Sequence, residues 1–137
     1  MNYTTSQIFH LPNCGITAIS LVSGIEYDTV WRTFMAVNRK RKNWRGRAYN
    51  GEMTKTMNSL QIHGKFYSDI CEVRPIKLKE FAIVTEKDES AYIAHITGHL
   101  LAVHKGIIGD QHSIAHYSEF KGRNGYIKNV WEIYKGA

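Results

Sequence analysis

The stretch that decides the fold is residues 91–104, which read AYIAHITGHLLAVH. It consists of two short apolar runs, 91–96 and 99–104, separated by the pair Thr97-Gly98. A two-residue break ending in glycine between two such runs is typical of a tight β-hairpin. We therefore predict two antiparallel strands here, joined by a turn at residues 97–98.

The patterns on either side of this hairpin differ in kind. On the C-terminal side, Lys105-Gly106 predicts a second turn into a strand at Ile107-Ile108, and residues 126–134 predict a further strand. On the N-terminal side, helical spacing of apolar residues predicts helices over 13–23, 27–37, about 54–63 and 78–85, with one strand over 65–73. Helices first and an antiparallel sheet second indicate an α+β fold, with N-terminal helices packed on a C-terminal antiparallel β-sheet.

Length and composition indicate one globular domain spanning residues 1–137. The chain is 43% hydrophobic and 22% charged, which is enough apolar surface for a core without a metal or disulfide. It contains no apolar run of about 18 residues and no basic-then-apolar leader, so we expect no membrane association. We expect a cytoplasmic protein whose Cys14 and Cys71 are free thiols, and no cofactor.

The basic charge is concentrated in one segment. Residues 29–56 hold eight Lys or Arg and one Glu, a net charge of +7 in a chain whose total is +6. The candidate binding residues there form a predicted loop: Arg39, Lys40, Arg41, Lys42, Trp44, Arg45 and Arg47. Clustered cations neutralise phosphates and an indole stacks on a base, so this loop could bind nucleic acid. It could equally dock an acidic protein partner, or be a solvated loop without a partner.

Cys14 lies at the start of the predicted helix 13–23, where Asn13 is a plausible N-cap. Helix-terminal N–H groups and the helix dipole stabilise a thiolate at such a position. We expect Gly15, which has no side chain, to leave room for a substrate at the helix start. Cys71 is expected to be a structural residue of a strand.

His99 and Asp110 complete a candidate catalytic set. A thiol that attacks an acyl group needs a base that later protonates the leaving group, and His99 opens a predicted strand that could lie beside the helix. Asp110 follows the hairpin turn at 105–106, so the returning strand should place it near His99, where it would orient the imidazole. His104, at the far end of the same strand, is the competing histidine.

These motifs resemble the papain-like cysteine peptidases. Asn13-Cys14-Gly15 opening an apolar helix, then residues 98–103 (GHLLAV), then residues 106–110 (GIIGD), are similar to the small bacterial and phage branch related to peptidase family C39. The resemblance covers about residues 7–113. It implies a papain-like fold and a Cys-His-Asp triad that hydrolyses an amide bond of a peptide or protein substrate.

The same resemblance implies an oxyanion donor. The family usually carries a Gln six residues before the nucleophile, whereas Gln7 stands seven before Cys14, with Pro12 absorbing the extra residue. Asn13 takes the place of the usual Asp. The resemblance therefore implies Gln7 as a catalytic residue, beside the backbone N–H of Cys14.

Two other readings remain. The histidine pairs 95/99 and 112/116 have a four-residue spacing, but the first pair straddles a turn and no metal-binding motif is present, so we predict no metal site. The chain could also be a catalytically inactive binding protein on the same fold. It would then be a phage-type inhibitor, acting in the host cytoplasm and using the loop at 39–47.

Overall fold

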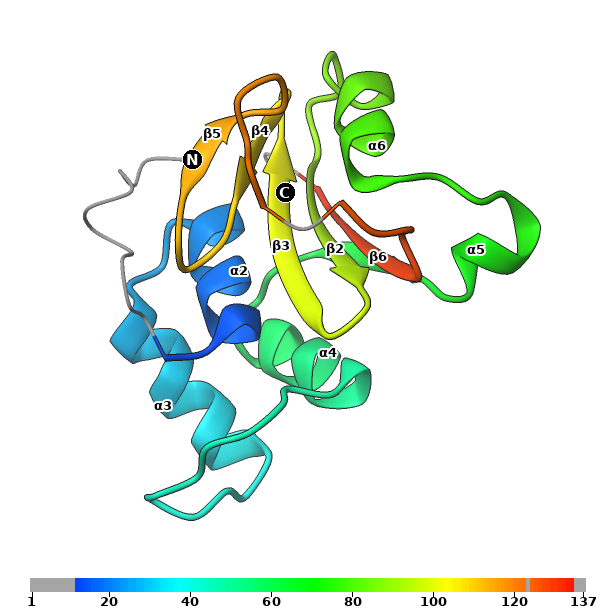
Figure 1. The fold of residues 1–137 in the computed structure, drawn as a ribbon. Coiled ribbons are helices and arrows are strands. Elements are labelled where there is room, and N and C mark those ends of the chain that lie inside the picture. The colour runs from blue at the N-terminus through cyan, green and yellow to red at the C-terminus, as the bar shows by residue number, and fades with distance from the viewer. Residues whose placement is uncertain (1–11, 123, 135–137) are drawn as a thin grey trace.

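The computed structural model describes residues 12–122 and 124–134 and shows a mixed α+β fold, as predicted (Figure 1). Its helices are α2 (Cys14–Ser23), α3 (Tyr27–Val37), α4 (Asn50–Ser59), α5 (Ile70–Val73) and α6 (Leu78–Val84). Its strands are β1 (Gly64–Tyr67), β2 (Ala91–Ile96), β3 (His99–His104), β4 (Ile107–Gly109), β5 (Ile114–His116) and β6 (Asn129–Ile133). Within the described ranges, no helix combines the length and the apolar character that crossing a bilayer requires.

The strands form one antiparallel sheet in the order β1-β6-β2-β3-β4-β5. The predicted hairpin is confirmed: β2 pairs with β3 from Tyr92 opposite Val103 to Ile96 opposite His99. Strands β2 to β5 follow one another as a meander, and β6 then returns to pair with the other side of β2. His99 therefore begins a central strand of the sheet.

Each face of the sheet has its own apolar cluster. Ile93 of β2 and Leu100 and Ala102 of β3 point toward helices α2, α3 and α4, which Figure 1 shows on one side of the sheet. Neighbouring residues such as Leu101 and Val103 point to the opposite face, where they pack with α6 and with Phe120 and Ile127. This alternation follows from the two-residue period of a strand, and it fixes which side of the sheet meets the helix that begins at Cys14.

The structure corrects several predicted elements. The third helix begins at Asn50 rather than about 54, because the Glu52 carboxylate accepts a hydrogen bond from the Tyr49 N–H at 3.1 Å and fixes an earlier start. The strand predicted over 65–73 ends at Tyr67. Residues 70–73 form a helical turn, so Cys71 is not in a strand. Strand β5 was not predicted, and β6 is shorter than the predicted 126–134.

Candidate active site

Asn13 fixes the position of Cys14 at the start of α2. Its Oδ1 accepts a hydrogen bond from the Ile16 N–H at 3.0 Å, which makes Asn13 the N-cap, as predicted. Its Nδ2 donates to the Gly46 carbonyl at 2.9 Å, which ties the helix start to the basic loop. Cys14 is therefore the first residue of the helix, where its backbone N–H has no partner in the preceding turn.

Gly15 has a different role from the one predicted. It is buried, and a Cβ built on it would lie 3.0 Å from the Ala48 Cβ and from the Met53 sulfur, and 3.1 Å from Leu100. The space beside Gly15 is thus filled by protein rather than left open for a substrate. The absence of a side chain lets α2 approach β3 and α4 closely, which brings Cys14 near the sheet.

His99 and Asp110 form a direct pair, as the hairpin geometry predicted. His99 Nε2 lies 3.0 Å from Asp110 Oδ2, and both side chains are largely shielded from solvent. The other carboxylate oxygen, Oδ1, accepts hydrogen bonds from the backbone N–H groups of His112 and Ser113, at 2.8 and 2.9 Å. Because Nε2 is engaged by Asp110, the ring nitrogen that remains for Cys14 is Nδ1.

The electrostatics favour an ion pair between Cys14 and His99. Burial raises the pKa of Cys14, but the His99 hydrogen bond and charge, with backbone N–H groups of Leu100 and Gly15, bring it below its ordinary value. Burial lowers the pKa of His99, but hydrogen bonds to Asp110 and Cys14 outweigh this and raise it to about 9. Both shifts favour a thiolate beside an imidazolium over a neutral thiol beside a neutral imidazole.

Asp110 is held in its ionised form. Burial raises the pKa of its carboxyl group, but the hydrogen bonds from His99 and from the His112 and Ser113 N–H groups lower it below its ordinary value. These backbone donors were not identified from the sequence. The signal was the Asp itself, since an Asp side chain often accepts from the N–H groups two and three residues onward in a turn.

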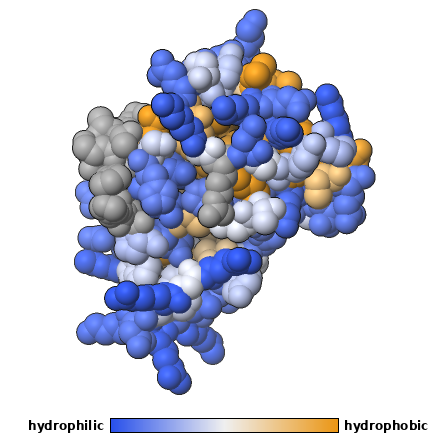
Figure 2. All heavy atoms as spheres, viewed as in Figure 1, coloured by the Kyte–Doolittle hydropathy of each residue, from blue (hydrophilic) through white to orange (hydrophobic). Residues whose placement is uncertain are grey.

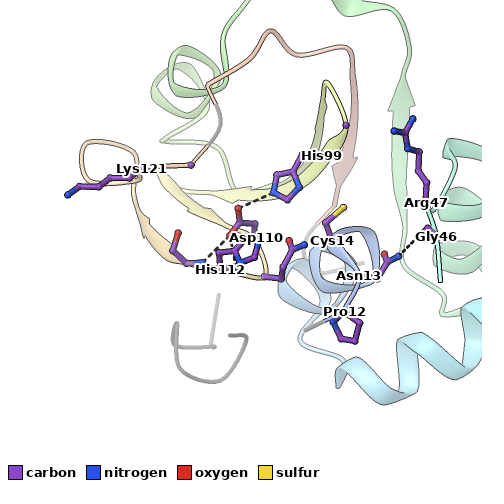
Figure 3. A pocket seen from close by; sticks show the side chains of 13 residues that line it. Pro12, Asn13, Cys14, Gly46, Arg47, His99, Asp110, His112 and Lys121 are labelled. Atoms are coloured by element: carbon purple, nitrogen blue, oxygen red, sulfur yellow. Dashed lines mark hydrogen bonds and ion pairs between the residues drawn. The ribbon is translucent and has the colours of Figure 1, made fainter. Parts of the chain in front are cut away.

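A cavity of about 630 Å³ gives access to these groups. Cys14, His99 and Asp110 all line it, and Figure 3 shows the His99 ring between the Asp110 carboxylate and the Cys14 thiol. Other side chains on its wall include Arg47, His112 and Lys121, so it is lined by basic residues in addition to the candidate triad. This volume accommodates several atoms of a peptide chain around the thiol.

Gln7, the remaining predicted catalytic residue, lies outside the described residues. His104 lies at the opposite end of β3 from His99, where it pairs with Ile107. Of the two predicted oxyanion donors, the structure therefore describes one, the backbone N–H of Cys14.

The basic loop divides into parts with different surroundings. Arg47 lines the cavity at Cys14, and Lys40 pairs with Glu52 at 2.6 Å. Lys42, Trp44 and Arg45 line a second cavity of about 450 Å³. The remaining cations, Arg39 and Arg41, are exposed. The Trp44 ring packs 4.9 Å from the ring of Phe34, so it is partly fixed against the helical core.

In each histidine pair noted for metal binding, one histidine is held by a contact to a residue outside the pair. His95 Nδ1 bonds Asn129 at 2.9 Å, and His116 lies 3.3 Å from Glu86. In the part of the chain that the structure describes, no three His, Cys, Asp or Glu side chains gather as a metal site would require.

Comparison with family models, curated proteins and solved structures found no match to this chain.

Proposed function

We propose that this protein is a papain-like cysteine peptidase or isopeptidase, with Cys14 as nucleophile, His99 as general base and acid, and Asp110 as the residue that orients His99. The observation that carries the proposal is a continuous series of contacts. The buried Asp110 carboxylate bonds His99, the His99 ring lies between Asp110 and the Cys14 thiol (Figure 3), and Cys14 begins a helix at the wall of a cavity that all three residues line.

The order of these contacts suits thiol chemistry. The Cys14 thiolate attacks the carbonyl carbon of an amide, forming a tetrahedral intermediate whose oxyanion accepts a hydrogen bond from the Cys14 N–H. His99, protonated at Nδ1, transfers that proton to the departing amine as the C–N bond breaks. It then takes a proton from water as that water attacks the thioester; the C–S bond breaks, the carboxylic acid leaves, and the Cys14 thiolate beside protonated His99 is regenerated. An amine in place of water would give acyl transfer instead.

The arrangement of elements supports the papain-like part of the proposal. The nucleophile lies on an N-terminal helix packed against a central antiparallel strand. The histidine is the first residue of that strand, and the aspartate directly follows the next one. The chain order Cys, His, Asp is also the one that the sequence resemblance implies.

The test is cleavage of a synthetic peptide library, read by mass spectrometry, with four forms of the full chain. We expect the wild type and Cys71→Ala to give the same cleavage products, and Cys14→Ala and His99→Ala to give none. Cys71 is the matched control because it lies on α5, apart from the candidate triad. Products that persist in Cys14→Ala would contradict the proposal.

A second candidate function is binding without catalysis. The observation that favours it is the set of loop cations without an ion-pair partner among the described residues: Arg39, Arg41, Lys42, Arg45 and Arg47. Such a surface would suit a nucleic acid or an acidic protein. If neutralising these residues abolishes the biological effect while Cys14→Ala preserves it, this second function replaces the first.

A further inference from the structure

A second cavity adjoins the one at Cys14. It measures about 450 Å³ and shares Pro12, Asn13 and Gly46 with the cavity that holds the thiol. Its remaining lining comes from α3 and from the basic loop: Trp31, Lys42, Asn43, Trp44 and Arg45. A polypeptide held across Cys14 would therefore meet this second cavity on one side of the bond to be cleaved.

The walls of this cavity combine two chemistries. The centroids of the Trp31 and Trp44 rings lie 5.6 Å apart, with the ring planes tilted by 44°. Trp44 also packs against the buried ring of Phe34. Rigid indoles of this kind bind an apolar or aromatic side chain with little loss of conformational entropy. Lys42 and Arg45 are exposed, with no ion-pair partner among the residues that the structure describes. They are therefore available to carboxylates.

The position of the cavity is fixed by contacts already described. The Asn13 side chain caps α2 with one atom and holds the Gly46 carbonyl with another, so the loop wall cannot shift without disturbing the start of the nucleophile helix. Lys40 Nζ lies over the Trp44 ring, 5.5 Å from its centre, while it pairs with Glu52 of α4, so the indole is also linked to that helix. Figure 2 shows strongly hydrophilic side chains over the end of the molecule where Figure 1 places this loop.

We propose that this cavity is a substrate-recognition subsite for an acidic polypeptide segment that carries a large apolar or aromatic side chain. The side chain would lie against the contacting rings of Trp31 and Trp44, and carboxylates flanking it would pair with Lys42 and Arg45. The inference rests on the proposed function, because it assigns the substrate class of that same site. It selects a polypeptide over a nucleic acid because the indoles line a concave cavity beside the nucleophile, rather than an open surface on which successive bases stack.

The test measures binding separately from cleavage, using the full chain with Cys14→Ala so that no substrate is consumed. The probe is a fluorescently labelled peptide of about ten residues with Phe flanked by Glu and Asp. Matched peptides replace the acidic residues by Gln and Asn, or the Phe by Ala. Fluorescence anisotropy gives each dissociation constant. We expect both replacements to weaken binding, and added salt to weaken the acidic peptide but not the neutral one.

The protein variants separate a local site from general charge attraction. Lys42→Gln with Arg45→Gln should weaken the acidic peptide by about 3- to 30-fold, the range expected for losing two solvent-accessible ion pairs. Arg32→Gln with Lys55→Gln removes the same charge from exposed positions on α3 and α4 and should leave binding within about twofold. Trp44→Phe keeps an aromatic ring against Phe34 and should weaken the Phe peptide more than the Ala peptide.

The outcomes are distinguishable from those of the proposed function. Equal losses in the two double variants, or tighter binding of single-stranded oligothymidylate than of the acidic peptide, would overturn the subsite. If the acidic peptide binds as expected but the wild type cleaves nothing, the cavity stands as a peptide-binding site and the peptidase proposal fails. If the wild type cleaves peptides with no preference for acidic sequences, the peptidase proposal stands and the subsite fails.

Discussion

The two oxygens of the Asp110 carboxylate have different partners, and this division decides what the residue can do. Oδ2 faces His99, while Oδ1 binds the backbone of the following turn at His112 and Ser113. The turn therefore holds the carboxylate rigid, and the carboxylate in turn fixes the orientation of the His99 ring. Asp110 itself was predicted from the sequence. Its two backbone donors were not, because their positions depend on how the chain turns after β4.

Asp110→Asn separates these two roles. The amide oxygen can still accept from the turn, so we expect a modest loss of folding stability, about 1–3 kcal/mol for replacing a charged acceptor. The amide NH₂ would face His99 Nε2 as a donor, which forces the ring proton to Nδ1 and removes the base that Cys14 needs. Activity should fall about 10²- to 10⁴-fold in kcat/KM, measured on a cleaved peptide. Near-wild-type activity would show that Asp110 has only a structural role.

The shifted pKa values of Cys14 and His99 predict the pH dependence of the thiol. Because the pKa of Cys14 is lowered, its alkylation by iodoacetamide should already be fast below the ordinary thiol range, measured in a Cys71→Ala background. In His99→Ala, only the backbone N–H groups of Leu100 and Gly15 still oppose the effect of burial on the thiol, so the inflection should move to higher pH. Peptide hydrolysis should decline as pH rises through about 9, where His99 loses the proton that the leaving amine requires. Identical alkylation profiles with and without His99 would exclude the ion pair.

At the scale of elements, the sequence predicted best where a single local pattern was sufficient. The hairpin of β2 and β3 was predicted with its turn and its bounds, because both strands are continuous apolar runs around Thr97-Gly98. Strand β5 has three half-buried residues, too few to show a periodic pattern. The start of α4 depends on a side-chain cap from Glu52 in a polar sequence, where apolar spacing carries no information.

Gly15 gives an element-scale prediction, because the approach of α2 to β3 and α4 depends on it. Gly15→Val would place a branched side chain where even a Cβ lies 3.0 Å from Ala48, so we expect a loss of about 2–3 kcal/mol or more. Gly51→Val is the matched control, since Gly51 lies in the first turn of α4 with no atom within 4 Å of its built Cβ. It should change stability by less than about 0.5 kcal/mol. Chemical denaturation measures both, and equal effects would mean that Gly15 is not a packing constraint.

At the scale of the whole molecule, the candidate triad and the adjoining cavity depend on segments far apart in sequence. Trp31 and Trp44 meet only because the basic loop folds back over α3, and the thiol meets His99 only because α2 packs on β3. The sequence suggested the triad through the order and spacing of three motifs around Cys14, His99 and Asp110. It gave no signal for the second cavity, whose walls form by tertiary packing alone.

The prediction that the chain is one domain can be tested through the two faces of the sheet. The three tryptophans, Trp31, Trp44 and Trp131, all pack with the cluster on the helical face, whereas Phe120 is buried in the cluster on the opposite face. If the sheet couples the two clusters, Phe120→Leu should lower the thermal midpoint measured by tryptophan fluorescence as much as the midpoint measured by far-ultraviolet circular dichroism. The expected shift is about 3–5 °C for a loss of about 1 kcal/mol.

Phe34→Leu, in the helical-face cluster, is the matched control and should also shift both midpoints together. A fluorescence midpoint unchanged by Phe120→Leu, with a lowered dichroism midpoint, would show that the two faces unfold separately. In that case Phe120→Leu should also leave the reactivity of Cys14 unchanged at temperatures where the far face has unfolded, because α2 packs on the tryptophan side of the sheet. Coincident midpoints instead imply that a substitution on the far face lowers the stability of the candidate active site by the same free energy as that of the whole domain.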